Sequence, residues 1–276
     1  MPSLTLCADD FALSRPISET IAELANDAKI NATSCMAVCE GWQADSALLR
    51  NLPPGFQVGL HLTLTDERPV TPMPRHAKHG QMPHIDRLGR MAIAKRLALD
   101  EVAQEIRAQF GLFGQALGRP PDFVDAHQHA HVLPGIRAVV LAETARSAPN
   151  AWVRDCGDTL LAMLSRPWRL KAFASAVHAA GIASAARNYG LRTNSGFAGH
   201  YDFQSDYAHA FPQFLRRPGH RHLVMCHPGA GRLAGDTIAG ARQVEAAALR
   251  RLSIPSLAEQ HGLEFGTELR SPSTKP

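Results

Sequence analysis

Short apolar runs alternate along this chain with longer stretches in which apolar residues recur at helical spacing. A run of four to eight apolar residues is typical of a buried strand, and recurrence every three to four residues is typical of a helix. The predicted strands are 4–8, 32–39, 57–65, 123–133, 152–156, part of 182–193, 222–226 and 263–266. The predicted helices are 14–29, 44–52, 93–117, 136–147, 159–180 with an interruption near Pro167, 203–215, 239–252 and 257–261.

Regular alternation of strands and helices without an internal linker predicts a parallel sheet in a single α/β domain of residues 1–276. At this length a closed or nearly closed (β/α) barrel, similar to a TIM barrel, is favoured over an open doubly wound sheet. Residues 66–90 interrupt the alternation with four prolines and three histidines and predict a long loop or lid. No Gly-x-Gly-x-x-Gly motif follows the first strand, which argues against a dinucleotide-binding fold.

Composition narrows the function classes. The 29 Lys and Arg residues give a net charge of +4 but form no cluster, and only 6% of residues are aromatic, so we expect no nucleic-acid partner. The sequence has no leader-like start and no apolar window long enough to span a membrane, which predicts a soluble, cytoplasmic protein. The five cysteines form no CxxC pair and are interpreted as reduced, buried residues; an iron–sulfur site at Cys35 and Cys39 lacks a third nearby cysteine.

The segment 123–134, FVDAHQHAHVLP, carries the strongest chemical signal. Asp125, His127, His129 and His131 alternate with other residues, and on an extended strand a period of two would place all four on one face. Such a face could line a metal pocket. On a helix the same residues would spread around more than half the circumference. We therefore predict that this segment is extended.

Polar residues also end other predicted strands. Asp9 and Asp10 follow the first strand, His61 lies in the third, and His227 follows 222–226. In a (β/α) barrel the C-terminal ends of the strands meet at one mouth, where functional residues are found. A group of carboxylates and imidazoles there predicts one divalent ion, with Zn, Co or Ni favoured by imidazole and Mg also compatible.

Asp9 and Asp10 are neighbours, and neighbouring residues on an extended strand point in opposite directions. They can share a site only if the chain bends at the end of the strand. One carboxylate could then bind the metal while the other takes a proton from the metal-activated water. The alternative is a helix cap or a solvated turn.

Four motifs together resemble those of the YdjC-type carbohydrate deacetylases. They are ADDFALS at 8–14, GLHLTLT at 59–65, DAHQHAH at 125–131 and CHPG at 226–229. The resemblance implies a distorted (β/α) barrel that removes acetyl groups from an N-acetylated sugar with a metal ion, Mg or Zn, with Co or Ni as alternatives. It makes Asp10, His61 and His127 the expected metal ligands and Asp9 the expected general base, in each case at the matching position of the motif.

Other roles stay open at this point. By the same resemblance, His227 either donates a proton to the leaving amine or holds the substrate. Asp125, His129, His131 and Arg154 are expected to orient ligands or contact the substrate, and Arg154 could also be a surface residue. The sugar could be free or lipid-linked, and a homodimer is compatible with the sequence. The competing functions are a barrel-type phosphoesterase or amidohydrolase and a non-catalytic sugar-binding or metal-binding protein.

Overall fold

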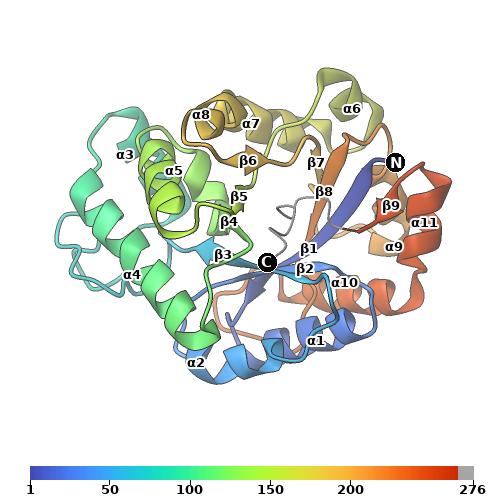
Figure 1. Cartoon of the computed structure of the whole chain (residues 1–276), viewed down its shortest axis with the longest axis horizontal. Helices are drawn as coiled ribbons and strands as arrows, with labels where there is room; N and C mark the ends of the chain where they lie inside the picture. The colour runs from blue at the N-terminus through green and yellow to red at the C-terminus, as the bar shows by residue number, and fades with distance from the viewer. Residues whose placement is uncertain (267–276) are drawn as a thin grey trace, which may run out of the picture.

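The computed structural model describes residues 1–266, and its strands form one parallel sheet surrounded by helices (Figure 1). The strands are β1 (Ser3–Phe11), β2 (Ala32–Cys35), β3 (Gln57–Leu62), β4 (Phe123–Ala126), β5 (Trp152–Val153), β6 (Arg192–Thr193), β7 (Phe197–Ala198), β8 (Arg221–Cys226) and β9 (Glu264–Phe265). Their order in the sheet is β6-β5-β4-β3-β2-β1-β8-β7, and β9 pairs with the start of β1. All of these pairs are parallel.

The sheet curls into a distorted (β/α) barrel, which confirms the predicted fold class. Within residues 1–266, no strand pairing joins β6 to β7, so the barrel is not closed by hydrogen bonds at that point. These two strands are separated by only three residues, and each is two residues long. The barrel is therefore regular on the side of β1 to β4 and irregular on the side of β5 to β7.

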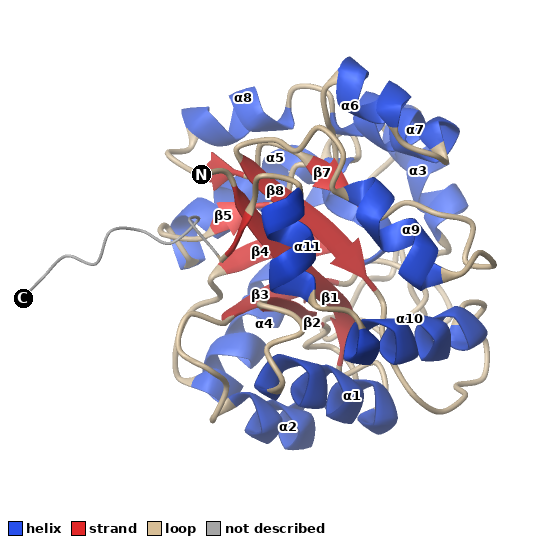
Figure 2. Cartoon of the chain, turned by 90° about the vertical axis from the view of Figure 1, so that its right-hand side faces the viewer, coloured by secondary structure: helices blue, strands red, loops and turns tan. Residues whose placement is uncertain are grey.

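The helices pack outside the strands (Figures 1 and 2). They are α1 (Arg15–Asn26), α2 (Trp42–Asp45), α3 (Ile85–Ile93), α4 (Leu99–Leu117), α5 (Ile136–Ser147), α6 (Leu160–Ser165), α7 (Arg169–Ala179), α8 (Ile182–Asn188), α9 (Tyr207–Phe214), α10 (Ala239–Arg251) and α11 (Ile254–Gln260), with 3-10 helices η1 (Ser46–Leu49) and η2 (His127–Val132). No helix of the described chain is both long and apolar enough to cross a membrane.

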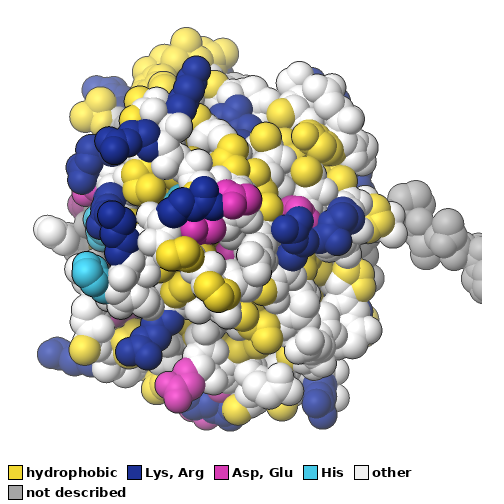
Figure 3. Space-filling view, turned by 90° about the vertical axis from the view of Figure 1, so that its left-hand side faces the viewer, with side chains coloured by type: hydrophobic (Ala, Val, Ile, Leu, Met, Phe, Trp, Pro, Cys, Tyr) yellow, Lys and Arg dark blue, Asp and Glu magenta, His cyan; other side chains and the backbone are white. Residues whose placement is uncertain are grey.

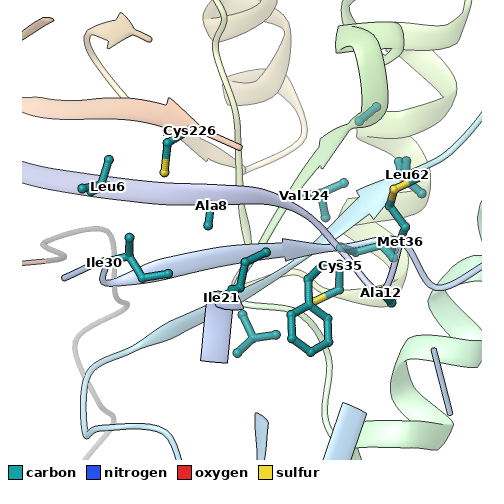
Figure 4. Close-up of a cluster of buried hydrophobic side chains, with 14 of the residues drawn as sticks. Leu6, Ala8, Ala12, Ile21, Ile30, Cys35, Met36, Leu62, Val124 and Cys226 are labelled. Atoms are coloured by element: carbon teal, nitrogen blue, oxygen red, sulfur yellow. The ribbon is translucent and has the colours of Figure 1, made fainter. Parts of the chain in front are cut away.

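One buried cluster lies between the strands and the helices (Figure 4). Leu6 and Ala8 of β1 meet Ile21 of α1 there, and Leu62 and Val124 belong to the same cluster. These side chains alternate along each strand with residues that point to the other face, as the period of a strand requires. Burial of this outward face against helices is what holds the barrel wall together.

The other face of the strands, which points into the barrel, carries a layer of apolar side chains followed by a layer of polar side chains nearer the C-terminal ends of the strands. Cys7, Ala32, Phe123, Trp152 and Met225 belong to a second buried cluster. Two residues further along the same strands, and so on the same face, lie Asp9, Ser34, Asp125, Arg154 and His227. The apolar layer thus ends where a polar layer begins at the C-terminal ends of the strands. Period-two patterning therefore gathers the polar groups in one place.

Gly59 and Phe123 show how tightly the apolar layer is filled. A Cβ atom on Gly59 would lie 2.3 Å from the Phe123 ring, so glycine is required for the ring to fit. The Phe123 ring stacks on Trp152 with 4.4 Å between centroids. This packed floor supports His61 and Asp125, which lie two residues beyond Gly59 and Phe123.

Several predicted boundaries are wrong. The strand expected within 182–193 is present as β6, Arg192–Thr193, and the alanine-rich start of that range forms α8. Predicted helix 93–117 begins later, as α4 at Leu99, because the chain turns at residues 94–98, where Lys95 has a positive φ of 55°; α3 ends just before this turn. Predicted strands 32–39 and 57–65 end earlier, at Cys35 and Leu62. The break near Pro167 is confirmed, since it separates α6 from α7.

The segment predicted as a lid has no helix or strand until Ile85, where α3 begins. It is nevertheless tied to the rest of the chain. Glu105 of α4 accepts hydrogen bonds from the backbone of Val70 and Thr71. Asp66 accepts one from Gln128, which lies next to His127 in η2, so the loop begins beside the polar layer.

Candidate metal centre

The end of β1 bends at the two neighbouring aspartates. Asp10 has a φ of 67°, in the left-handed region that non-glycine residues rarely adopt, and the pairing of β1 with β2 shifts register between Ala8 and Phe11. The bend is held by hydrogen bonds from Leu13 N to Asp10 O (3.1 Å) and from Met36 N to Phe11 O (2.9 Å). The predicted bend is confirmed, and both carboxylates are buried in the same polar layer.

Asp10, His61 and His127 come from three separate elements and converge. Asp10 Oδ1 lies 3.3 Å from His61 Nε2 and 3.0 Å from His127 Nδ1. One ligand atom from each residue lies within 4.8 Å of the other two. Burial alone would raise the pKa of Asp10, but Arg242 and His127 hold it well below its usual value, so Asp10 is a carboxylate.

Asp125 fixes the orientation of His61. Asp125 Oδ1 lies 2.7 Å from His61 Nδ1 and also accepts a hydrogen bond from the Ser34 hydroxyl. A carboxylate behind a ligating imidazole orients the ring and makes it a better ligand. Burial would lower the pKa of His61, but Asp125 and Asp10 raise it to about 10. The buried negative charge on both sides of this ring therefore favours a cation at this position.

Asp9 is bound by Arg154 instead of lying next to the imidazoles. Arg154 donates to both oxygens of Asp9, with Nη1 to Oδ2 and Nη2 to Oδ1 each at 2.6 Å. It also forms an ion pair with Asp125. Although burial would raise the pKa of Asp9, Arg154 holds it well below its usual value. Arg154 is fully buried, so the alternative that it is a surface residue is wrong.

The prediction that residues 123–133 form one extended strand is wrong. β4 ends at Ala126, and residues 127–132 form the 3-10 helix η2, in which Gln128 and His129 have positive φ values of 52° and 57°. Asp125 and His127 still reach the polar layer, but by different routes: one from the strand and one from the turn. The alternating sequence pattern therefore does not correspond to a continuous strand, because the backbone changes direction after Ala126.

His129 and His131 consequently leave the Asp10 cluster. His131 is buried and its Nε2 donates to the carbonyl of Arg154 at 2.9 Å, where burial lowers its pKa to about 4. The His129 ring lies against Phe197 and His200, with centroid distances of 5.6 and 5.8 Å. His131 therefore supports the backbone at Arg154, and His129 belongs to a separate group of rings beside the polar layer.

His227 lies at the end of β8, as the sequence predicts. Its backbone N–H donates to Glu245 of α10, and its ring packs 5.7 Å from Phe203 between centroids. The ring nitrogen Nδ1 is buried without a hydrogen-bond partner in the structure. Burial lowers the pKa of His227 despite the nearby Asp10 and Asp9, so the neutral imidazole is favoured.

Three residues near the centre were not predicted. Arg242 of α10 binds the second oxygen of Asp10 at 2.7 Å. Glu245 accepts a hydrogen bond from the Tyr201 hydroxyl at 2.7 Å as well as from His227. His200 packs against both the His129 and the Phe197 rings and has an unpartnered Nε2. Charged residues on a predicted helix are typical of a solvated face, so no sequence pattern pointed to Arg242 and Glu245.

The residues present fit a divalent metal ion. Two imidazoles and one carboxylate are a donor set that zinc and related ions accept, and three protein ligands leave positions for water and substrate. A second group, Cys7, Asp9 and Asp125, also has close ligand atoms. There the Arg154 guanidinium already contacts all three side chains, so its positive charge takes the place that a metal would need.

The fold and the site define the class of protein: a distorted parallel (β/α) barrel with a carboxylate and imidazole centre at the C-terminal ends of its strands. Comparison with known proteins gives its family. The model of the YdjC-like protein family matches residues 3–260. The chain therefore belongs to the YdjC-like family. It is similar to a chitooligosaccharide deacetylase of Enterobacter sp. (strain 638), with 36% identity over 143 residues, which is 52% of this chain and 56% of that protein.

A mouse protein, called a carbohydrate deacetylase, is 34% identical over 207 residues, which is 71% of this chain and 65% of the mouse protein. The matches to the bacterial deacetylases span about half the length of those relatives. Among solved structures, an Enterococcus faecalis protein described as a cellobiose-phosphate cleavage protein matches with a TM-score of 0.74 and 19% identity over 96% of this chain and 97% of that one. At this identity the structural match supports the fold.

Proposed function

We propose that this protein is a metal-dependent carbohydrate deacetylase, which hydrolyses the acetamide of an N-acetylated sugar. Membership of the YdjC-like family and the names of the similar proteins support the reaction class. The observation that carries the proposal is the convergence of Asp10, His61 and His127 next to a separate, ionised Asp9. Chitooligosaccharides are the first substrates to test because the bacterial relatives are named for them.

Asp10, His61 and His127 would hold the ion, with His61 oriented by Asp125. When bound, a divalent ion acts as a Lewis acid that acidifies a water and polarises the acetamide carbonyl. Arg242 holds the other oxygen of Asp10 and so leaves Oδ1 directed at the two imidazoles. Oδ1 is therefore the oxygen of Asp10 that would be free to hold an ion together with the two imidazoles.

Asp9 serves as the general base in this proposal. The double hydrogen bond from Arg154 keeps its carboxylate ionised and fixed in position, so it is ready to take a proton from the attacking water. A carboxylic acid next to a guanidinium is a strong acid, so protonated Asp9 readily gives the proton to the leaving nitrogen. One group can thus perform both transfers, and the products are acetate and a free amine.

His227 holds the substrate in this scheme. Its ring is favoured in the neutral form, and because the residue is only partly buried, the imidazole can hydrogen-bond a polar group of the sugar. Phe203 packs against the ring, and Glu245 holds the backbone of His227. These contacts fix the position of the imidazole at the end of β8.

The test is acetate release from chitooligosaccharides and other N-acetylated sugars, with the free amine measured in parallel. We expect equimolar acetate and amine from the parent chain, and a rate at least about a hundredfold lower for Asp9→Asn. Asp158→Asn is the matched control, because Asp158 also pairs with a buried arginine, Arg166, in a separate ion pair. Release of phosphate from sugar phosphates instead of acetate would favour the phosphoesterase alternative.

A further inference from the structure

The helices α6 and α7 expose an unusual amount of apolar surface. Leu160, Leu161 and Leu164 on α6 are 58%, 63% and 49% exposed, and Leu170 and Val177 on α7 are 81% and 72% exposed. These are five of the twelve large hydrophobic side chains that are exposed in the described chain. Scattered exposed leucines are ordinary, but a contiguous group marks a site of contact with another surface.

The exposed side chains of α7 lie on one face of the helix. Leu170, Ala174 and Val177 are spaced by four and three residues, which aligns them along the helix axis, and all three are exposed. On the opposite side the helix is barely covered, since Ala179 is its only buried residue. The apolar face of α7 therefore points away from the barrel.

The surroundings of this surface are strongly basic. Residues 159–201 contain no Asp or Glu but five Lys or Arg residues, one of which, Arg166, is buried and paired with Asp158; residues 158–201 thus carry a formal charge of +4, as much as the whole chain. Two further arginines, Arg216 and Arg217, lie beside α6. Buried Arg166 holds them there, because it donates to both of their backbone carbonyls. The side chains of Arg169, Arg216 and Arg217 are exposed.

The same surface lies at the rim of the barrel mouth. Lys171 of α7 donates to the Tyr201 carbonyl at 2.7 Å, and its ammonium lies 5.3 Å from the Phe203 ring, which packs against His227. In Figure 3, hydrophobic side chains with Lys and Arg beside them gather at the top of the molecule, where Figures 1 and 2 place α6 and α7.

We propose that α6 and α7 dock on the surface of an anionic lipid bilayer. We call Leu160, Leu161, Leu164, Leu170 and Val177, with Arg169, Arg216 and Arg217, the docking surface. Aliphatic side chains on exposed helices with basic residues at their edge are the composition of an interfacial membrane contact. A symmetric dimer through this surface would place the arginines of the two copies against each other, which charge repulsion opposes.

The experiment measures co-sedimentation of the full chain with vesicles of phosphatidylcholine, with and without one third phosphatidylglycerol. We expect binding only to the anionic vesicles, and weaker binding as salt rises. The triple variant L160S/L161S/L164S and the double variant R169Q/R217Q should each reduce binding about tenfold or more. Ile93→Ser is the control, because Ile93 is also 69% exposed but lies on α3. It should bind like the parent.

All substituted side chains are exposed, so folding is checked by the thermal unfolding midpoint, which should stay unchanged. The proposal is overturned if the parent does not sediment with anionic vesicles, or if the triple serine variant binds as well as the parent. It is also overturned if the parent is a dimer that the triple variant converts to a monomer without any vesicle binding. None of these readouts uses turnover, so the proposal stands or fails separately from deacetylation.

Discussion

At the candidate metal centre, two residues of the same type, Asp9 and Asp10, have different partners. Asp9 and Asp10 are adjacent, yet the positive φ of Asp10 directs one carboxylate to Arg154 and the other to the imidazoles. Asp125 touches both groups, because it pairs with Arg154 and with His61. The proposed roles of Asp9 as base and Asp10 as ligand thus depend on the positive φ of one residue at the end of β1.

Asp125→Asn tests how His61 is held. The substitution removes a buried negative charge from behind the imidazole, so we expect metal affinity to fall about tenfold or more. Binding is measured by competition with a chromogenic chelator, with Asp158→Asn as the control that should leave affinity unchanged. An affinity within about twofold of the parent would mean that Asp125 does not support the ligand.

The comparison of Asp9→Asn with His61→Ala separates the base from the ligands. We expect Asp9→Asn to keep its metal, because Asp9 does not contact the imidazole cluster and its charge is already neutralised by Arg154. His61→Ala should lose most of its metal, because it removes one of the three ligands. Elemental analysis of both purified proteins checks this. Equal loss of metal from both variants would contradict the division of roles.

The elements that could be predicted from the sequence are those marked by a pattern of neighbouring residues. The strand positions of Asp9, His61 and His227 follow from apolar runs that end in polar residues, and these ends do meet in one layer. The turn after Ala126 was not predictable, because alternating residues look extended whether or not the backbone has positive φ angles. Arg242 and Glu245 were missed because only the tertiary fold brings α10 to Asp10 and His227.

Gly59→Ala tests the packed floor beneath the centre. The new Cβ would lie 2.3 Å from the Phe123 ring, which is itself stacked on Trp152, so we expect a loss of about 1 to 3 kcal/mol of unfolding free energy. Gly240→Ala is the matched control, because a Cβ there meets no atom within 4 Å on α10. It should be neutral or slightly stabilising. Urea unfolding measures both, and equal stability of the two variants would contradict this packing.

For the whole molecule, the buried Glu245 should make stability depend on pH. Burial raises its pKa from 4.5 to about 7, despite hydrogen bonds from His227 and Tyr201. The folded state therefore binds its proton more tightly than the unfolded state does. Protonated Glu245 therefore contributes about 3 kcal/mol to the free energy of unfolding. This contribution is fully present below pH 4.5 and is lost as pH rises through about 7.

Glu245→Gln removes this titration. The difference in unfolding free energy between parent and variant should change by about 3 kcal/mol between pH 5 and pH 8, in the direction that favours the variant at pH 8. Urea unfolding at several pH values gives this difference, and the other titrating groups cancel from it. Parallel pH profiles for the two proteins would show that Glu245 does not titrate in this range.

In the proposed mechanism, this barrel removes acetyl groups with a metal ion held by Asp10, His61 and His127. The most direct measurement is acetate release from N,N′-diacetylchitobiose by protein stripped with a chelator and then reloaded with Zn, Mg, Co or Ni. We predict that stripping abolishes release, that at least one ion restores it, and that none restores it to His61→Ala. Full acetate release by stripped protein without detectable metal would show that the reaction does not depend on a metal ion.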